Sequence, residues 1–433
     1  MKVLIVGSGA REHALAWRLR QSPGLTALWV ASGNGGTAQI ATNLNVAPDD
    51  VEAIPKYAKG LGIDLVVVGP EQPLAAGLVD RLDAVGIPAF GPTQAAAQIE
   101  SSKGFALELM REAGVPCPEF NSFQDETLAL SFLEKHSEPT VIKADGLAAG
   151  KGVFMCRTSE EAASAVRACM SQRVFGGAGD TVVIEEFLEG PEVSVFAFSD
   201  GERLSPPVAA CDYKRLGDGD EGPNTGGMGS FAPPDFWNEE LAGEITRTIM
   251  EPVIHALAQR GTPYRGVLYA GLMLTNRGPK VLEFNCRFGD PESQVILPQL
   301  VGDPLDIMAA CIEGKLADTP VEWSDRNYAG VVLVSAGYPE KYETGFEITG
   351  LDADERNTNI FQAATRIESG RVVTSGGRVL TVVGSGESLA EARDAAYHRV
   401  QTIGFEGASY RGDIADVEAR TRLWLPDPAA PTG

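Results

Sequence analysis

Four short, uninterrupted apolar runs in the first hundred residues constrain the fold of this chain most strongly. They occupy residues 3–6, 28–31, 65–68 and 87–90. A strand with one face in water alternates apolar and polar residues, whereas a strand buried on both faces is apolar throughout. Segments with helical character, such as residues 12–20, separate these runs. We therefore expect a parallel sheet with helices on both faces at the N-terminus.

The sequence pattern changes twice more along the rest of the chain, which indicates two further structural units. Between residues 101 and about 325 we expect a compact α+β unit, and from about residue 328 a second, smaller one. The expected strands are residues 140–144, 181–184, 271–275, 280–284, 330–335 and 378–383, and the expected helices are residues 159–170 and 389–403. Thr158 with Glu161, and Ser388 with Glu391, have the spacing of helix-capping pairs. The Pro- and Ala-rich residues 426–433 predict a flexible tail.

Composition excludes several classes of function. The chain of 433 residues has 36 Lys and Arg against 59 Asp and Glu, a net charge of −23. Nucleic-acid and polybasic membrane binders need a net basic surface, so we expect neither partner. The six cysteines include no C-x-x-C, and the four histidines form no ligand pair, which disfavours a disulfide framework and structural zinc. No run is long enough for a membrane span or a signal peptide, so we expect a cytoplasmic protein.

The segment Gly7-Ser8-Gly9-Ala10-Arg11-Glu12 partly matches the glycine-rich turn of dinucleotide-binding folds. Glu12 replaces the third glycine of that pattern, and a carboxylate in the first helical turn would repel a pyrophosphate. The second apolar run ends in Ala31-Ser32-Gly33, without the acid that binds a ribose hydroxyl in those folds. Nicotinamide binding is therefore disfavoured. The segment is either a plain tight turn or a surface approached by another ligand, with Glu12 accepting hydrogen bonds.

Residues 145–152, Asp-Gly-Leu-Ala-Ala-Gly-Lys-Gly, follow the predicted strand that contains Lys143. They lack the Walker pattern G-x-x-x-x-G-K-[ST]. Their backbone N–H groups could still hold an oxyanion, with Lys143 and Lys151 adding positive charge. Taken alone, the residues favour the alternative, a mobile hairpin with two solvated lysines.

The strand predicted at residues 181–184 leads into Glu185-Glu186-Phe187-Leu188-Glu189-Gly190. Adjacent carboxylates at a strand end are usually a solvated edge. The alternative is a strand that offers its backbone N–H and C=O groups to the edge of a purine, with a nearby acid holding the ribose hydroxyls. The local sequence indicates this only weakly.

The most informative local segment is Glu283-Phe284-Asn285-Cys286-Arg287-Phe288-Gly289-Asp290-Pro291-Glu292. On a strand, Glu283, Asn285 and Arg287 would share one face, and Phe284 and Phe288 the other. Mg²⁺ prefers oxygen ligands, commonly one or two carboxylates together with substrate phosphates. A carboxylate, an amide oxygen and a guanidinium in line would suit a metal-bound triphosphate. The alternative is an ordinary polar surface strand.

Asp212 and Lys214 also share a strand face, directly before a glycine-rich segment. Residues 217–230 hold six glycines in fourteen positions and include Asn224-Thr225-Gly226-Gly227-Met228-Gly229. Such a polar loop is either a linker or a place where backbone touches substrate, and composition does not decide between the two.

In their order along the chain, these segments resemble the glycinamide ribonucleotide synthetase family, the phosphoribosylamine–glycine ligases of the ATP-grasp class. The resemblance rests on GSGAREHALAW, VVVGPE, FGPT, SSKGF, VIKADGLAAGKGV, VIEEFLEGPE, DYKR, GPNTGGMG, YAGLM, LEFNCRFGDPE and SGGRVL, from Met1 to about Asp413. It implies an α/β and α+β multidomain fold. The implied parts are an N-terminal α/β substrate domain (1–100), an ATP-grasp domain (101–325) with a small lid (about 122–190), and a C-terminal α/β domain (326–425).

The resemblance also implies roles for individual residues. Implied nucleotide contacts are Lys103, Lys143, Gly150, Lys151, Gly152, Glu185, Glu186, Phe187, Leu188 and Glu192. Implied metal ligands, for Mg²⁺ or Mn²⁺, are Glu283 and Asn285. Implied residues at the reacting groups are Lys143, Asp212, Arg287 and Asp290, and implied substrate contacts are Gly9, Glu12, Glu71, Lys214, Thr225, Gly226 and Gly227. ATP-grasp proteins often have a second carboxylate on the preceding strand, but residues 271–274 here read Gly-Leu-Met-Leu.

The implied reaction joins glycine to 5-phosphoribosylamine with ATP as co-substrate, giving glycinamide ribonucleotide, ADP and phosphate through glycyl phosphate. Two alternatives stay open. The chain could be another ATP-grasp ligase that joins a different acid and amine, or a nucleotide-sensing protein without catalysis. No segment of the sequence indicates a subunit interface, so we expect a monomer.

Overall fold

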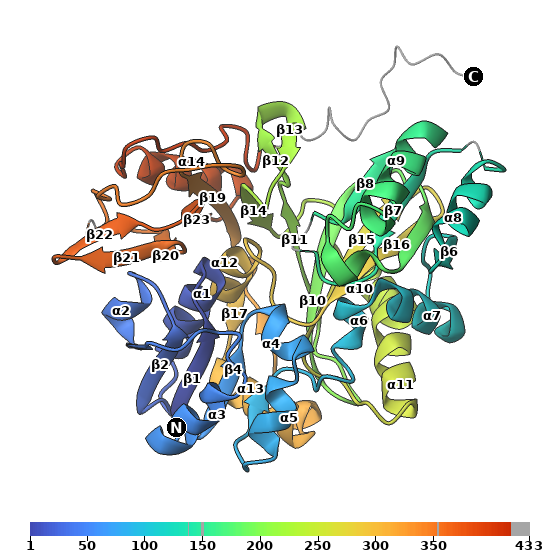
Figure 1. Cartoon of the computed structure of the whole chain (residues 1–433). Coiled ribbons are helices and arrows are strands. Elements are labelled where there is room, and N and C mark those ends of the chain that lie inside the picture. Colours follow the sequence, from blue (N-terminus) through green and yellow to red (C-terminus); the bar gives the residue numbers. More distant parts are fainter. Residues whose placement is uncertain (137, 149–150, 353–354, 417–433) are drawn as a thin grey trace.

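The computed structural model describes residues 1–416 except 137, 149–150 and 353–354. Gly150 and the tail predicted at residues 426–433 therefore lie outside the described residues. The described chain forms an N-terminal parallel sheet, a long antiparallel sheet and a small sheet that stands over one end of the long one (Figure 1). The fold is thus α/β and α+β, as the sequence predicts.

The N-terminal sheet has the order β3-β2-β1-β4-β5, and every neighbouring pair is parallel. Its strands are β1 (Lys2–Gly7), β2 (Ala27–Ser32), β3 (Thr42–Leu44), β4 (Leu65–Val68) and β5 (Ala89–Phe90), and its helices are α1 (Ala10–Leu19), α2 (Thr37–Ile40), α3 (Ala53–Leu61), α4 (Glu71–Ala75) and α5 (Leu78–Asp83). Along β1, Leu4 and Val6 join one hydrophobic core while Val3 and Ile5 join a second. The apolar run is therefore buried on both faces, which confirms the predicted parallel sheet.

An eight-stranded antiparallel sheet runs through the rest of the molecule in the order β16-β15-β10-β11-β14-β19-β23-β20. Its strands are β10 (Glu192–Asp200), β11 (Val208–Asp212), β14 (Gly229–Ala232), β15 (Arg265–Thr275), β16 (Gly278–Asn285), β19 (Asn327–Val334), β20 (Thr358–Gln362) and β23 (Arg378–Gly386). The pairing of β14 with β19 joins the central part of the chain to the C-terminal part. The hairpin predicted around residues 276–279 is confirmed by the β15–β16 pair.

A small four-stranded sheet, β6-β9-β7-β8, forms a separate lobe that we call the lid. It comprises β6 (Phe120–Phe123), α8 (Glu126–Leu133), β7 (Thr140–Ala144), β8 (Val153–Cys156), α9 (Ser159–Met170) and β9 (Val182–Glu186). It has its own hydrophobic core. The predicted capping pair at α9 is confirmed, because Thr158 Oγ1 accepts the Glu161 N–H at 3.2 Å.

The glycine-rich segment 217–230 is more ordered than a plain loop. Part of it pairs as a two-stranded hairpin of β12 (Arg215–Gly217) and β13 (Glu221–Asn224), and its last residues begin β14. The prediction of a loop throughout was wrong here. Short strands with several glycines and prolines lack the alternating apolar pattern from which strands are predicted.

The remaining α-helices and strands connect or flank these three sheets. They are α6 (Gln98–Ser101), α7 (Lys103–Ala113), α10 (Glu239–Ile245), α11 (Glu251–Gln259), α12 (Ser293–Ile296), β17 (Leu300–Val301), α13 (Pro304–Glu313), β18 (Glu322–Trp323), β21 (Thr365–Glu368), β22 (Arg371–Thr374) and α14 (Leu389–Val400). At α14 the predicted cap is confirmed, since the Ser388 side chain accepts from the Glu391 N–H. Within the described part of the chain, no helix has the length and apolar character needed to cross a membrane.

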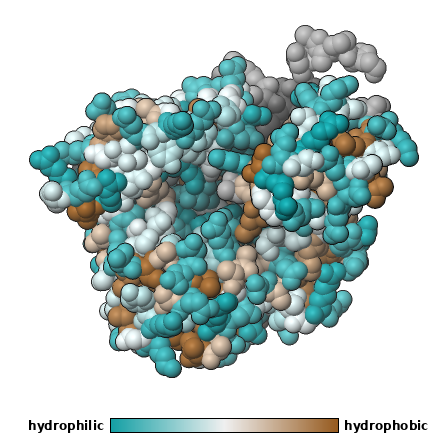
Figure 2. All heavy atoms as spheres, viewed as in Figure 1, coloured by the Kyte–Doolittle hydropathy of each residue, from teal (hydrophilic) through white to brown (hydrophobic). Residues whose placement is uncertain are grey.

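The face seen in Figure 1 is hollowed in its middle. Figure 2 shows this hollow, lined mainly by hydrophilic residues, between α4 below, the C-terminal region at upper left and the lid at upper right. The segments that follow β11 and β16 come together in this part of the fold, since Gly227 packs against Pro291 just before α12. It is the place where most of the sequence-predicted site residues gather.

Candidate active site

The end of β16 forms the floor of the site. Glu283 pairs in register with Gly271 and Asn285 with Tyr269, so their side chains share one face of the sheet, as predicted. Arg287 lies beside them, because its Nη2 donates to Asn285 Oδ1 at 3.1 Å.

The predicted shared face for the two phenylalanines was wrong. Phe284 packs in one hydrophobic core and Phe288 in the other, on opposite sides of the sheet. The strand ends at Asn285, and the chain turns before Phe288. The alternation of a strand therefore does not extend to residue 288.

Arg287 is held by two carboxylates from distant parts of the chain. Its Nε contacts Glu71 Oε2 at 3.2 Å, and its Nη2 contacts Glu100 Oε1 at 3.0 Å. Glu71 begins α4, so this ion pair joins the N-terminal sheet to β16. Glu100 also accepts the Cys286 N–H at 2.7 Å; burial raises the pKa of its carboxyl, although Arg287 opposes the rise. Sequence reasoning assigned no role to Glu100, since nothing local indicates a partner so far along the chain.

Lys143 and Glu185 meet between the lid and the floor. Lys143 Nζ lies 2.7 Å from Glu185 Oε2, and it also donates to the Leu282 carbonyl on β16 at 2.9 Å. Lys103 lies nearby at the start of α7. Burial lowers the pKa of Lys103, and the positive charge of Lys143 lowers it further, although Glu283 opposes the shift. Two cations and a carboxylate thus converge beneath the lid.

The loop 145–152 is anchored at its first residue. Asp145 Oδ1 accepts the Gly104 N–H at 2.6 Å at the start of α7, and Lys103 Nζ donates to the Gly146 carbonyl at 3.3 Å. Gly152 packs tightly, because a Cβ there would lie 2.7 Å from Ala148 Cβ. Lys151 is exposed. The loop therefore starts directly beside the Lys103 ammonium.

The residues at the end of β9 and directly after it lie in two environments. Glu186, the last residue of β9, pairs with Arg277 and Lys280 at 2.6 Å each, so it has the solvated-edge arrangement. Leu188 is buried, and the Arg157 guanidinium lies over the Phe187 ring. Glu192 begins β10 and pairs with Lys214. The structure therefore separates Glu186 from Glu185, which faces Lys143.

Asp212 and Lys214 lie on the other side of Glu283. Burial raises the pKa of Asp212 to about 7, with Lys214 opposing the rise and Glu292 adding to it. Glu283 is exposed on the surface of the site; desolvation by the surrounding residues opposes its ionisation, but Lys214 and Lys143 together hold its pKa below the ordinary value. Glu283 is therefore ionised and surrounded by cations.

The glycine loop is pinned to Lys214. The Thr225 N–H and Oγ1 both donate to the Lys214 carbonyl, at 2.7 and 2.9 Å. Gly227 has φ +109°, and a Cβ there would lie 2.4 Å from Pro291 Cδ, so only glycine fits. This arrangement brings Thr225, Gly226 and Gly227 next to the segment after β16.

The N-terminal turn faces the same segment. Glu12 is buried and its Oε2 accepts the Gly9 N–H at 2.6 Å, the amide that a dinucleotide-binding turn would offer to a phosphate. A Cβ on Gly9 would lie 3.3 Å from Asp290 Oδ2. Gly9 is thus close to Asp290. Arg11, for which sequence reasoning gave no role, ties the turn to the Phe288 carbonyl at 3.1 Å.

Glu283 and Asn285 are the oxygen donors that fit a divalent cation. No group of three or more His, Cys, Asp or Glu side chains suited to a metal occurs within the described ranges. The position opposite Glu283 is Gly271, so the preceding strand supplies no second carboxylate. A cation at Glu283 and Asn285 would need further oxygens, which the phosphates of a nucleotide can provide.

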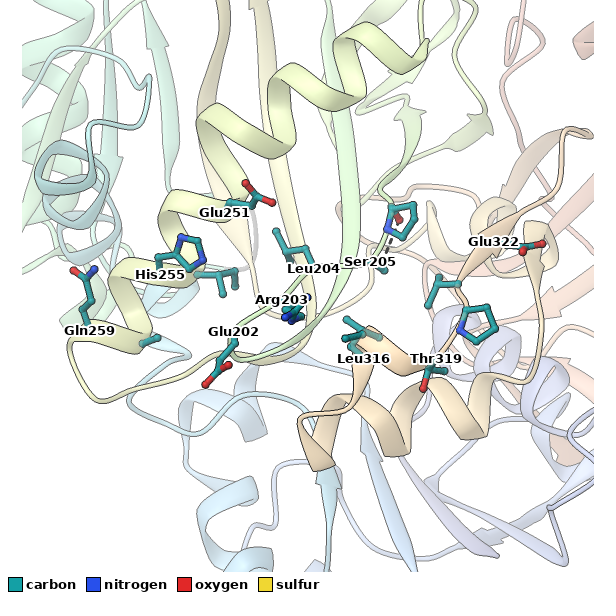
Figure 3. Close-up of a pocket in the computed structure, with 16 residues that line it drawn as sticks. Glu202, Arg203, Leu204, Ser205, Glu251, His255, Gln259, Leu316, Thr319 and Glu322 are labelled. Atoms are coloured by element: carbon teal, nitrogen blue, oxygen red, sulfur yellow. Dashed lines mark hydrogen bonds between the residues drawn. The ribbon is translucent and has the colours of Figure 1, made fainter.

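A separate pocket of about 920 Å³ lies between α11, the turn after β10 and residues 316–322. Figure 3 shows Glu251 and His255 of α11 on one side of this pocket and Leu204 and Leu316 on the other. None of the sequence-predicted site residues lines this pocket. The candidate active site is therefore the hollow at the ends of β11 and β16.

Comparison with known proteins agrees with this geometry. Models of the phosphoribosylglycinamide synthetase N domain, ATP-grasp (A) domain and C domain match residues 1–100, 101–293 and 328–417. A phosphoribosylamine–glycine ligase of Caldanaerobacter subterraneus is 47% identical over 415 residues, covering 96% of this chain and 99% of that one. The human trifunctional purine biosynthetic protein adenosine-3 is 46% identical over 95% of this chain and 41% of its own length.

Solved structures give the same picture. The crystal structure of phosphoribosylamine–glycine ligase from Thermotoga maritima has a TM-score of 0.82 and 34% identity, covering 95% of this chain and all of that one. A biotin carboxylase domain from Hydrogenobacter thermophilus, in complex with MgADP, has a TM-score of 0.72 at 15% identity and shows a likeness of fold alone.

The fold and the lysine, glutamate and asparagine set at the floor define an ATP-grasp protein. Within that class, the chain belongs to the phosphoribosylglycinamide synthetase family.

Proposed function

We propose that this chain catalyses the ATP-dependent ligation of glycine to 5-phosphoribosylamine, giving glycinamide ribonucleotide, ADP and phosphate, a step of purine biosynthesis. The observation that carries the proposal is the convergence of Lys103, Lys143, Glu283, Asn285 and Arg287 at the end of β16. At the same place the N-terminal sheet contributes Glu71. The near full-length relatives that carry this activity in their names support the same conclusion.

ATP would lie between the lid and β16. Lys143 and Lys103 face this gap and would neutralise the triphosphate, while the loop 145–152 would close over it. The adenine would lie against residues 185–188, with Glu192 at the ribose. Glu186 takes part less directly, since Arg277 and Lys280 already pair with it. Gly150 and Lys151 would contact the nucleotide.

Mg²⁺ or Mn²⁺ would be held by Glu283 and Asn285 together with phosphate oxygens. Such a cation, when bound, screens the charge of the phosphates and lets a nucleophile approach the γ-phosphorus. The ionised state of Glu283 suits this role, because Lys214 and Lys143 lower its pKa.

A free carboxylate is a poor electrophile for an amine, so the glycine carboxylate must be activated first. One of its oxygens would attack the γ-phosphorus of ATP, breaking the bond to the bridging oxygen and giving glycyl phosphate and ADP. Arg287 would stabilise the charge on the moving phosphoryl group, and Glu71 and Glu100 fix the orientation of its guanidinium.

In the second step, the neutral amine of phosphoribosylamine would attack the acyl carbon, and phosphate would leave as the amine loses a proton. Gly9, Glu12 and Glu71 line the N-terminal side of this position, and Asp290 lies against Gly9. The loop Thr225–Gly226–Gly227, Asp212 and Lys214 close the opposite side. Water must be excluded, since it would hydrolyse the acyl phosphate.

We further propose the division into residues 1–100, 101–325 with the lid, 326–425 and a short tail, a cytoplasmic location and a monomeric state. The six cysteines all lie in the described ranges and are free thiols, which suits a reducing compartment.

The test is ADP release with ATP, Mg²⁺ and glycine, with and without phosphoribosylamine made in situ from ribose 5-phosphate and ammonia. ADP formation that requires both substrates supports the ligase. ADP formation with other acids or amines instead would indicate a different ATP-grasp ligase. Bound ATP without ADP formation under any condition would indicate a nucleotide-binding protein and overturn the proposal.

A further inference from the structure

The C-terminal region reaches the candidate site through two side chains, Tyr338 and Arg378. Arg378 begins β23, and its Nη1 donates to the Asp290 carbonyl at 2.8 Å and also to the Gly226 carbonyl. Its Nη2 lies 3.2 Å from Asp290 Oδ2. The Gly226 N–H in turn donates to Tyr338 Oη at 2.9 Å. Both backbone groups of Gly226 are thus held by side chains from the C-terminal region.

The two side chains are positioned by one turn. A Cβ on Gly377 would lie 2.4 Å from the Tyr338 ring, so the ring rests on the backbone of the residue that precedes Arg378. Ser335 fixes this turn, since its N–H donates to the Gly377 carbonyl at 2.8 Å and its Oγ donates to the Gly376 carbonyl at 2.9 Å. The sequence Ser-Gly-Gly-Arg at residues 375–378 therefore delivers the guanidinium to a fixed place.

The contacts of Arg378 join two segments that face the N-terminal turn. Asp290 is 18% exposed and its other oxygen accepts from Gln294 Nε2 at 2.9 Å, so its carboxylate has a defined orientation toward Gly9. The Gly226 loop packs against Pro291 through Gly227. Burial opposes ionisation of Asp290, but Arg378 keeps its pKa below the ordinary value. None of these contacts involves the residues beneath the lid.

We propose that Arg378, together with Tyr338, is a positioning residue that holds Gly226 and Asp290 in the arrangement that receives phosphoribosylamine. The inference rests on the proposed function for the identity of that substrate. We call these contacts of Arg378 and Tyr338 with Gly226 and Asp290 the clamp. The lysines that would bind ATP take no part in it, so loss of the clamp weakens the binding of the amine substrate more than that of the nucleotide.

The test uses the full-length variants Arg378→Gln, Arg378→Lys and Tyr338→Phe. Arg371→Gln is the matched control, because Arg371 pairs with exposed Glu347 in the same region. Hydrogen exchange of the backbone amides of residues 225–227 reports the clamp directly. Steady-state KM values for phosphoribosylamine, glycine and ATP report its role in the reaction, and thermal unfolding confirms that each variant is folded.

We expect Arg378→Gln and Tyr338→Phe to speed exchange at residues 225–227 and leave α9 of the lid unchanged. We expect Arg378→Gln to raise KM for phosphoribosylamine at least about tenfold with KM for ATP within about twofold, and Arg378→Lys to recover part of this loss. Unchanged exchange would overturn the clamp, whatever reaction the protein catalyses. Faster exchange with unchanged KM for phosphoribosylamine, or an equal rise for ATP, would overturn its role toward the amine. ADP formation by the wild type without one of the two substrates would instead overturn the proposed function. In that case, hydrogen exchange at residues 225–227 would still show whether Arg378 and Tyr338 hold the loop.

Discussion

Lys143 and Glu185 form a 2.7 Å ion pair whose side chains are only 7% and 2% exposed, and the same ammonium donates to the Leu282 carbonyl. The ion pair therefore joins the lid strands β7 and β9, and the hydrogen bond to Leu282 fastens Lys143 to the floor strand β16. The pair also leaves a cation at the place where the phosphates of ATP would lie. We therefore propose that this lysine has both a structural and a nucleotide-binding role, and the two can be separated by mutation.

Replacing Lys143 by Met should have two effects. It leaves the Glu185 carboxylate buried without a cation, which costs about 3 kcal/mol of unfolding free energy, and it weakens ADP binding at least about tenfold. The double variant Lys143→Met/Glu185→Leu should recover most of the stability but none of the affinity. Urea unfolding and ADP titration measure the two effects, with exposed Lys56→Met as the control. Recovery of ADP affinity in the double variant would contradict a direct role for Lys143.

Replacing Glu283 by Gln should abolish turnover while leaving the thermal midpoint nearly unchanged. The carboxylate is exposed on β16 among cations, so its replacement would remove the proposed metal ligand without opening the core. We expect kcat to fall by about a thousandfold or more. Glu240→Gln, at an exposed position on α10, is the control. Near-normal activity of the Glu283 variant at saturating Mg²⁺ would rule out the metal assignment.

The glycine loop gives a paired test of backbone requirement. Gly227 has φ +109° and contacts Pro291, so Gly227→Ala should cost about 1–3 kcal/mol and displace the loop, lowering kcat/KM for phosphoribosylamine. Gly243 lies in α10 with open space around it, so Gly243→Ala should instead stabilise by about 1 kcal/mol. Thermal unfolding and steady-state kinetics of both variants check this. Equal behaviour of the two alanines would show that the loop geometry is not needed.

The stability of the protein should depend on pH through His13. This ring is buried between α1 and β20, its Nδ1 accepts the Gln362 N–H at 2.8 Å, and burial lowers its pKa to about 4. Between pH 6.5 and 4 the unfolded chain binds a proton that the native ring does not, so stability falls as the pH is lowered through this window. The loss amounts to about 3 kcal/mol.

The variant His13→Ala isolates this effect. Its unfolding free energy should fall less steeply than that of the wild type between pH 6.5 and 4, as measured by urea unfolding at several pH values. His255→Ala, at an exposed position on α11, should follow the wild-type curve. Parallel curves for wild type and His13→Ala would show that His13 does not control acid stability.

Local sequence patterns predicted those strands and shared faces that depend only on neighbouring residues. The strand at residues 65–68 was placed at its observed bounds, because it is a short apolar run between turn residues, and the strand at residues 140–144 was also placed at its observed bounds. Glu283 and Asn285 share a face because the period of a strand is two. The same rule failed at Phe288, since the sequence does not show that the strand ends three residues earlier.

Long-range pairs could not be predicted from sequence alone. Glu100 of α6 meets Arg287, and Arg378 at the start of β23 meets Asp290, only because the fold brings segments far apart in the sequence together beyond the end of β16. Resemblance to a family indicated which segments belong to the site. It assigned no role to Glu100, Tyr338 or Arg378, although Arg378 lies within the matching segment SGGRVL.

The most direct test of the account is ADP release by the wild-type protein with ATP, Mg²⁺, glycine and phosphoribosylamine, omitting one substrate at a time. The account predicts rapid ADP formation only when glycine and phosphoribosylamine are both present, with glycinamide ribonucleotide formed in equal amount. ADP formation that continues when glycine or phosphoribosylamine is left out would contradict this function. The absence of ADP formation from a protein that still binds ATP would also contradict it.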